Sequence, residues 1–220
     1  MKNKLIKILI IPVILIFALW LFRFIYNKIE YKKEKAITYI LSDKEKKLIN
    51  NGDIILRRGY GMISDYIVNS FNEKYKISHS GIIEKKDGKI NVIHSESSSL
   101  LKTEGIQKQS LDEFTDAGHK NSVIIVRFNK CSDNEYNKIT NRANYYLNKK
   151  IPFSYTLKPK DTTQMFCSEV IWHIFLDEFN VDIFSGKNNK TDFYQFKNFW
   201  DTTYFDVIIN HQNKKHLKNL

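Results

Sequence analysis

The stretch SHSGIIEKKDGKINVIHSE, residues 78–96, carries the pattern that decides the fold. Two apolar-rich runs flank Asp87-Gly88, a dipeptide that favours the two-residue turn of a β-hairpin. Such a turn pairs Lys86 with Lys89 and fixes every other pair in the hairpin. The stretch therefore predicts two antiparallel strands of known register.

This register brings four residues to one face. His79 falls opposite Glu96 and Gly81 falls opposite His94, and opposed residues share a face of the sheet. The two imidazoles are then diagonal neighbours, and Gly81 adds no side-chain bulk beside them. A one-residue slip would reverse the assignment. The hairpin thus predicts a cluster of titratable groups.

The surrounding sequence predicts one mixed α and β domain over residues 36–210, with no internal repeat. Short β-rich runs alternate with segments of helical periodicity and with capping boxes such as Ser42 with Glu45. We expect strands at 53–57, 123–128 and 204–209, and helices at about 63–71, 133–147 and 165–179.

Residues 1–35 predict a membrane anchor with a basic flank. The chain is uncharged from Ile8 to Phe22, and the segment from Leu5 to Tyr26 covers the ~30 Å hydrocarbon layer at ~1.5 Å per residue. The alternative is a cleaved signal peptide, but residues 18–21, Ala-Leu-Trp-Leu, lack the pair of small residues that a peptidase needs. We therefore expect a retained transmembrane helix. Lys and Arg are more numerous after the span than before it, which favours a cytoplasmic domain, whereas a short N-terminal end favours the opposite side.

The charge distribution argues against nucleic-acid binding. The formal net charge is +11, but +6 lies in residues 1–35 and +3 in a basic tail at 211–220, which leaves +2 for residues 36–210. A near-neutral domain offers no basic groove for a nucleic acid.

Cys167 is the candidate nucleophile. The two cysteines, Cys131 and Cys167, form no Cys-x-x-Cys pair, so neither a disulfide framework nor a closely spaced metal motif is indicated. Cys167 falls in the first turn of the helix expected near 165, where unpaired N–H groups and the helix dipole favour a thiolate. Its alternatives are a small buried hydrophobe, or a zinc site together with His79 and His94.

Four motifs in order resemble one known family. They are Gly52-Asp53-Ile54-Ile55-Leu56, Ser78-His79-Ser80-Gly81-Ile82-Ile83, Val92-Ile93-His94-Ser95 and Phe166-Cys167-Ser168-Glu169-Val170. Their order and spacing are similar to those of the permuted NlpC-type papain-fold thiol hydrolases, and most of all to the YiiX-like branch. The resemblance covers residues 51–179. It implies an α+β fold, a circularly permuted papain-like domain with a central antiparallel sheet.

The resemblance also implies a catalytic site without a cofactor or metal. The matching positions are Cys167 as nucleophile, His79 as base and His94 as the third residue. YiiX-like members tend to have Glu at that third position, whereas the related lecithin retinol acyltransferase-like enzymes have His. Glu96, on the same inferred face, is the alternative residue to orient the base.

The segment before the cysteine helix departs from the family pattern. A Tyr-Asp-Phe-like stretch is common there, but residues 152–155 read Pro-Phe-Ser-Tyr. Tyr155 is therefore only a weak candidate for substrate contact, and Gln164 is a candidate for either an oxyanion contact or a helix cap. The backbone N–H of Cys167 is the safer oxyanion donor.

The sequence as a whole predicts a single-pass membrane protein with a cysteine hydrolase domain of the peptidase or amidase type. The expected substrate is a peptide or acyl-amide from the cell envelope or linked to lipid, and the resemblance favours an extracytoplasmic domain. One alternative is a lipid-directed acyltransferase or phospholipase of the same fold. The other is a catalytically silent, membrane-tethered binding module.

Overall fold

The hairpin around Asp87-Gly88 forms with the predicted register. In the computed structural model, which describes residues 2–34, 38–97, 104–156, 162–184 and 195–213, strand β2 (His79–Lys86) pairs with β3 (Lys89–Glu96). Lys86 lies opposite Lys89, and the pairing runs from there to Ile82 opposite Ile93. Asp87 and Gly88 have φ values of 52° and 73°, as a type I′ turn requires.

This hairpin is part of a six-stranded antiparallel sheet. The strand order is β4-β3-β2-β1-β5-β6. The other strands are β1 (Ile54–Arg57), β4 (Gly105–Ser110), β5 (Ile124–Phe128) and β6 (Phe205–Asn210). The strands predicted at 53–57, 123–128 and 204–209 are therefore present. Strand β4 was not expected, because its sequence GIQKQS lacks the apolar alternation of a half-buried strand and it lies at an edge of the sheet.

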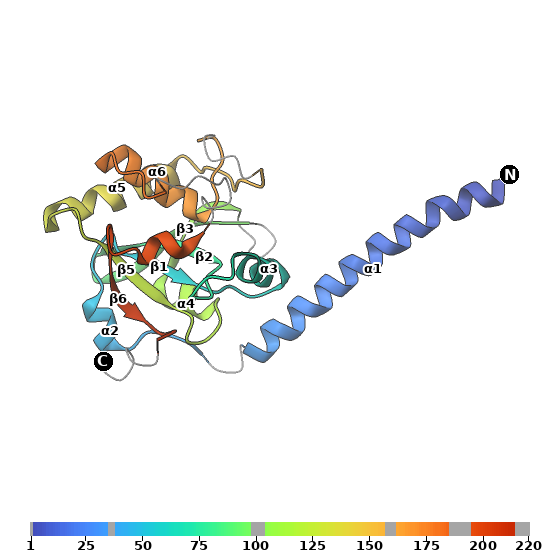
Figure 1. Ribbon diagram of the computed structural model, residues 1–220, viewed down its shortest axis with the longest axis horizontal. Helices are drawn as coiled ribbons and strands as arrows, with labels where there is room; N and C mark the ends of the chain where they lie inside the picture. Colours follow the sequence, from blue (N-terminus) through green and yellow to red (C-terminus); the bar gives the residue numbers. More distant parts are fainter. Residues whose placement is uncertain (1, 35–37, 98–103, 157–161, 185–194, 214–220) are drawn as a thin grey trace.

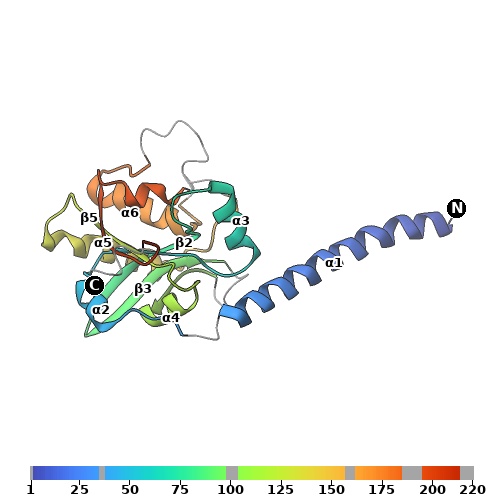
Figure 2. The ribbon, with the colours of Figure 1, turned by 60° about the horizontal axis from the view of Figure 1, so that its bottom comes forward.

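Helices cover both faces of the sheet (Figures 1 and 2). Helices α5 (Tyr136–Asn148) and α6 (Cys167–Phe179) pack on one face, and α2 (Asp43–Leu48) and α4 (Leu111–Asp116) pack on the other. The described residues also form two short 3-10 helices, Asp133–Glu135 and Phe196–Trp200. The helix predicted near 165 thus begins at Cys167.

The alternation of side chains along the strands divides the core in two. On β2, Ile82 faces α5 and α6, whereas Ile83 faces Leu111 and Phe114 on the α4 side. His79 and Gly81 have the parity of Ile83, so their side of the sheet is the one that α4 covers.

Gly81 is needed because two strands approach closely beside it. A Cβ atom on Gly81 would lie 2.5 Å from Val92 Cγ1 and 3.2 Å from His94 Cβ. We expect Gly81→Ala to lower the free energy of unfolding by about 1–3 kcal/mol through overpacking. Chemical denaturation of the detergent-solubilised full chain measures this. Gly59→Ala, where the atoms nearest to a Cβ would lie 3.6 Å away in ordinary contact, is the control, and equal losses in both variants would contradict the account.

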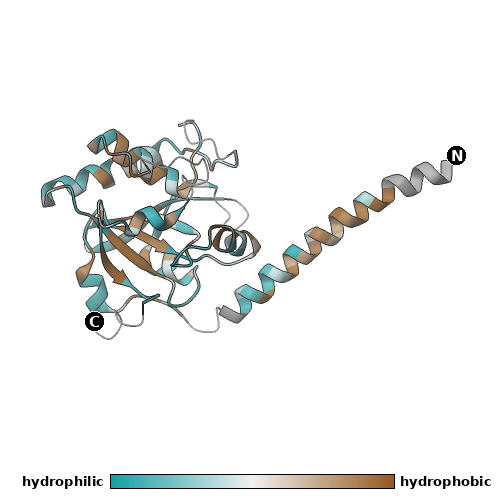
Figure 3. Ribbon diagram, viewed as in Figure 1, coloured by the Kyte–Doolittle hydropathy of each residue, from teal (hydrophilic) through white to brown (hydrophobic). Residues whose placement is uncertain are grey.

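Helix α1 (Lys2–Glu34) projects away from the domain (Figure 1). Residues Ile10–Lys32 are long and apolar enough to cross a membrane, and their side chains are largely exposed in the structure. Figure 3 shows the apolar colour along the middle of this helix. The helix therefore fits a membrane span or a signal sequence.

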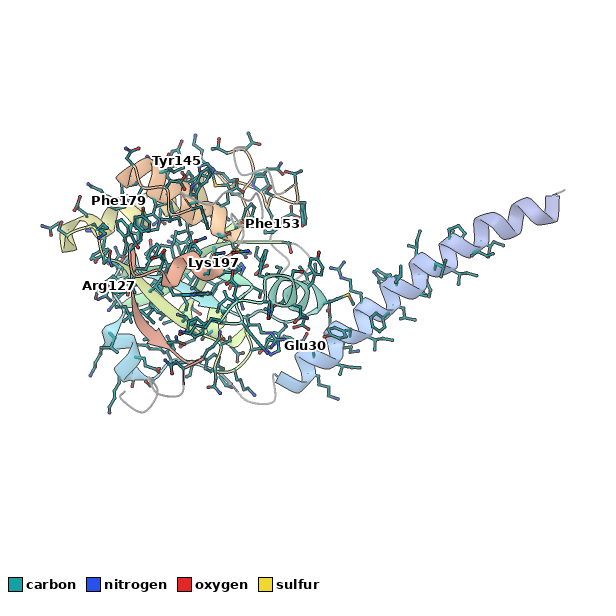
Figure 4. All side chains as sticks on the ribbon, viewed as in Figure 1. Glu30, Arg127, Tyr145, Phe153, Phe179 and Lys197 are labelled. Carbon is teal, nitrogen blue, oxygen red and sulfur yellow. The ribbon has the colours of Figure 1, made fainter. Side chains whose placement is uncertain are left out.

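The last turns of α1 contact the domain at α3 (Met62–Phe71). Asn27 Oδ1 accepts a hydrogen bond from Met62 N–H at 3.1 Å, and Glu30 Oε2 accepts one from Gly61 N–H at 2.6 Å. Glu30, labelled in Figure 4, also pairs with His119 at 2.8 Å. Two side chains of α1 thus cap the start of α3, where Gly61 offers no side-chain cap of its own.

Candidate active site

Cys167 is the first residue of α6, and its side chain is half-buried. The helix begins there because Phe166 has extended backbone and the Glu169 carboxylate accepts a hydrogen bond from Phe166 N–H at 3.2 Å. The thiol is therefore held at the N-terminal end of a helix that packs against β2 and β3.

His79, His94 and Glu96 form a connected group. His79 Nε2 lies 2.9 Å from His94 Nδ1 and 3.3 Å from Glu96 Oε2, and all three side chains are buried. These contacts confirm that the three residues share one face, as the hairpin register predicted. Nδ1 of His79 is then the ring nitrogen not used in these contacts.

Arg57 and Phe114 complete this group, and neither was predicted from the sequence as a site residue. Arg57 lies opposite His79 in the backbone pairing of β1 with β2. Its Nη2 donates a hydrogen bond to Glu96 Oε2 at 3.4 Å. Its guanidinium lies 4.4 Å from the centre of the Phe114 ring, against which both imidazoles also pack. Among the described residues, Nε and Nη1 of Arg57 have no hydrogen-bond partner. The sequence signal that could have indicated Arg57 is a charged residue at the end of the otherwise apolar strand Ile54–Arg57.

A cavity of about 1330 Å³ contains the candidate residues in its wall. Cys167, His79, Glu96 and Arg57 line it, whereas His94 is buried behind His79. The Cys167 thiol lies at the start of α6 and hydrogen-bonds with Ser80, whereas the His79 ring packs against Phe114 on the α4 side of the sheet. Among the described residues, the structure therefore does not bring the thiol and this imidazole into hydrogen-bond contact. Catalytic hydrogen bonds are often long before substrate binds and shorten in the complex.

Burial keeps the Cys167 thiol and the His79 and His94 imidazoles neutral. It raises the pKa of Cys167 to about 11, although hydrogen bonding from Ser80 acts in the opposite direction. Burial also holds the pKa of His79 well below its usual value, with further lowering by Arg57 and His94, and lowers the pKa of His94 to about 3. The raised pKa runs against the expectation of a thiolate favoured by the helix start, because desolvation by burial is the largest effect on this thiol. At neutral pH the site holds a thiol beside neutral imidazoles.

The raised pKa predicts slow alkylation of Cys167 at neutral pH. Only the thiolate reacts, so in a Cys131→Ala background the rate with iodoacetamide should rise about tenfold per pH unit from 7 to about 10. Mass spectrometry of the modified chain measures the rate. A rate that is already high and constant between pH 5 and 8 would indicate a preformed thiolate–imidazolium pair instead.

Of the two weaker candidates, Tyr155 and Gln164, the structure places only one in the described wall of the cavity. Tyr155 lines the cavity, and its hydroxyl donates to Glu104 at 3.3 Å. Gln164 donates to Thr156 at 3.3 Å and is absent from the described wall of the cavity. The structure therefore brings Tyr155 to the site and leaves Gln164 beside it.

The donor atoms of His79, His94 and Glu96 lie within 4.8 Å of one another, close enough to be tested as metal ligands. Two imidazoles and a carboxylate are a donor set that zinc accepts. However, the two imidazoles hydrogen-bond directly to each other, and the buried guanidinium of Arg57 already lies on Glu96. A second cation would displace the first, so this group does not fit a metal. The structure groups Glu96, rather than Cys167, with the two histidines.

A cysteine at a helix start, facing a cavity shared with a histidine on a neighbouring antiparallel strand, is the arrangement of papain-like thiol hydrolases. Residues 48–208 match the family model described as "Permuted papain-like amidase enzyme, YaeF/YiiX, C92 family", and the chain belongs to this family.

A solved structure supports the fold. The chain is similar to a protein described as "metalloprotein yiiX from Escherichia coli O157:H7", with a TM-score of 0.52 and 17% sequence identity over 72% of this chain and 88% of that one. No curated protein matches the chain. The comparisons confirm the expected YiiX-like permuted papain fold.

Proposed function

We propose that this chain is a membrane-anchored cysteine hydrolase that cleaves an amide bond. One observation carries the proposal: Cys167 at the start of α6 and His79 on β2 lie in the wall of one cavity, within the segment that matches an amidase family. The substrate class is a peptide or acyl-amide. The E. coli protein is described as a metalloprotein, but we do not propose a metal for this chain. The Arg57 guanidinium already lies beside Glu96, where a metal cation would have to bind.

The reaction begins with two neutral groups. His79 Nδ1 takes the proton of the Cys167 thiol while Sγ attacks the carbonyl carbon of the amide. The backbone N–H of Cys167 stabilises the resulting oxyanion. The C–N bond then breaks, His79 returns the proton to the leaving amine, and water hydrolyses the thioester to a carboxylic acid and free thiol.

His94 and Glu96 orient the base. Both approach Nε2 of His79, at 2.9 Å and 3.3 Å respectively, and a hydrogen bond at that nitrogen fixes the ring with Nδ1 turned to the substrate side. We assign His94 as the principal partner because its contact is shorter. Burial raises the pKa of Glu96, although Arg57, which hydrogen-bonds to that carboxyl, acts in the opposite direction.

Helix α1 is the anchor in this proposal. Its uncharged run ends at Phe22 and is followed by Asn27 and Glu30, which cap α3 within the domain. Removal of the helix as a signal peptide would leave the first amides of α3 without these caps. This favours retention of the helix in the mature protein.

A lipid-directed acyltransferase or phospholipase is the second candidate. The histidine at position 94 and the apolar walls of the cavity favour it. Product analysis separates the two: a hydrolase releases the acyl group to water, and a transferase passes it to an added amine. A silent binding module would do neither.

A thiol-directed acylating probe tests the proposed nucleophile. We expect the full-length protein to be labelled at Cys167, the Cys167→Ala variant to lose the label, and Cys131→Ala to keep it. Cys131 is the matched control because it is the other cysteine of the chain and is also half-buried. Equal labelling of the Cys167→Ala variant would overturn the assignment.

A further inference from the structure

A second, smaller hollow of about 440 Å³ has a basic wall. Arg58, Lys76, His119 and Lys120 line it, and none of the residues in its described wall is acidic. The rest of that wall is polar and comes from the side chains at positions 121, 122 and 212. None of these residues lines the cavity that contains Cys167. The basic hollow is therefore separate from the candidate active site in both position and chemistry.

Hydrogen bonds between distant segments build the frame of the basic hollow. The side-chain amide of Gln212 accepts from Lys76 N–H at 2.8 Å and donates to the Ser122 carbonyl at 2.9 Å. Ser122 Oγ accepts from Arg58 N–H at 3.2 Å, and His119 N–H donates to the Arg58 carbonyl at 2.8 Å. These bonds fix the backbone of four segments around the hollow, so its basic side chains start from a rigid frame.

Two lysines give the basic hollow positive charge that no carboxylate balances. Among the described residues, the amines of Lys76 and Lys120 form no ion pair, whereas the other two basic residues of the wall each contact a carboxylate. Residues 36–210 together carry a net charge of only +2, so two unpaired amines at one hollow are a local concentration of charge. Ammonium groups held in this way bind the oxygen atoms of a phosphate group.

The basic hollow meets α1 just beyond the expected end of the hydrocarbon layer. His119 in its wall pairs with Glu30 of α1 at 2.8 Å, where α1 reaches the domain (Figure 4). Arg58 pairs with Asp65, which accepts a hydrogen bond from Tyr26 of α1 at 2.7 Å. The hydrocarbon segment ends close to Tyr26, and Glu30 lies ~6 Å further along the helix at ~1.5 Å per residue. Since the headgroup layer is ~5–7 Å thick on each side, the wall of the hollow contacts α1 at headgroup level.

We propose that the basic hollow binds the phosphate group of an anionic phospholipid, which the amines of Lys76 and Lys120 contact. The inference rests on the proposed role of α1 as an anchor and gives the domain a second attachment to the bilayer. Because the hollow and α1 lie at different points of the domain, the two attachments together hold it in one orientation. A soluble phosphate ester carries the same chemical group, and the location beside α1 favours the lipid as its source.

The rate of lysine acetylation measures occupancy of the basic hollow. Full-length protein is placed in nanodiscs of phosphatidylcholine, alone or mixed with phosphatidylglycerol, and treated with an amine-acetylating reagent. We expect acetylation of Lys76 and Lys120 to be about fivefold slower with phosphatidylglycerol, since a phosphate-bound ammonium group is not available to react. Mass spectrometry of the digested protein gives the rate at each lysine. Unchanged rates at both lysines would overturn the proposal.

Two exposed lysines outside the basic hollow are the internal controls. Lys86 lies at the other end of β2, and Lys32 lies on α1 close to the membrane. Both should keep their rates in the two kinds of nanodisc. Equal slowing at Lys32 would indicate diffuse attraction to the anionic surface and would overturn a specific site. Slowing by inorganic phosphate in phosphatidylcholine nanodiscs, without an effect of phosphatidylglycerol, would overturn the lipid as the ligand.

Charge reversal provides an independent measurement of bound lipid. Native mass spectrometry of the detergent-solubilised full chain should show more than about tenfold less phosphatidylglycerol on the variant with Lys76→Glu and Lys120→Glu than on the wild type. The matched control, Lys86→Glu with Lys89→Glu, makes the same charge change at two exposed residues of the hairpin and should bind as the wild type does. Equal loss in both variants would contradict the site.

Failure of the anchor is distinguishable from failure of the basic hollow. A wild-type chain that does not remain in phosphatidylcholine nanodiscs lacks the anchor, and the headgroup site falls with it. A chain that remains there but shows no effect of phosphatidylglycerol lacks only the headgroup site. Neither readout depends on turnover, so Cys167→Ala should give the wild-type result in both experiments.

Discussion

Replacing Cys167 with alanine is expected to lower kcat/KM for amide hydrolysis by at least about a thousandfold, because the thioester intermediate can no longer form. The loss should appear in kcat, since the side chain is small and contributes little to substrate binding. A fluorogenic acyl-amide assay with the full-length protein in detergent measures it.

Cys131→Ala is the control for this experiment. Cys131 packs against the hydrophobic core outside the described wall of the cavity, so its loss should leave kcat/KM within about twofold. Cys167→Ser tests the same point with a near-isosteric side chain, and we expect it to be almost as inactive because a hydroxyl is a far weaker nucleophile. Substantial activity in Cys167→Ala would contradict the account.

Replacing His79 with glutamine is expected to lower kcat by about a hundredfold to ten-thousandfold, the range for loss of a general base. The effect is large because the pKa of the Cys167 thiol is raised to about 11, so almost no thiolate exists at neutral pH without a base. Activity of the His79→Gln variant should therefore rise as the pH approaches that pKa, whereas the wild-type protein should show no such steep rise.

His211→Gln is the control for the loss of a buried histidine. His211 hydrogen-bonds to Tyr39 and Glu45 on the α2 side of the sheet, away from the described wall of the cavity. The variant is expected to lose stability while keeping the kcat of the folded protein. If His79→Gln keeps wild-type kcat at neutral pH, another group must act as the base.

The arrangement of the two histidines could be predicted because a local signal determines it. Asp87-Gly88 fixes the turn, the turn fixes the register, and the register sets the face of His79 and His94. A helix from about Met165 was predicted from helical periodicity, and α6 begins two residues later, at Cys167. Where local signals are strong, the elements and the shared face of His79 and His94 followed from the sequence.

The missed features depend on contacts between distant segments. Arg57 and Phe114 are 57 positions apart in the chain and meet only because α4 packs under the sheet. The raised pKa of Cys167 depends on burial by the folded domain, which a helix-start pattern does not reveal. Strand β4 is recognised through its pairing with β3, because its own sequence has a weak strand pattern.

The acyl-enzyme is the species that the account requires, and its detection is the most direct test. Full-length protein is mixed with an acyl amide, quenched in acid within the first turnover and measured as an intact chain. We predict a mass increase equal to one acyl group, located at Cys167, removed by hydroxylamine and absent from Cys167→Ala. Amide cleavage that proceeds with no adduct on Cys167, or with an adduct that persists in Cys167→Ala, would contradict the account.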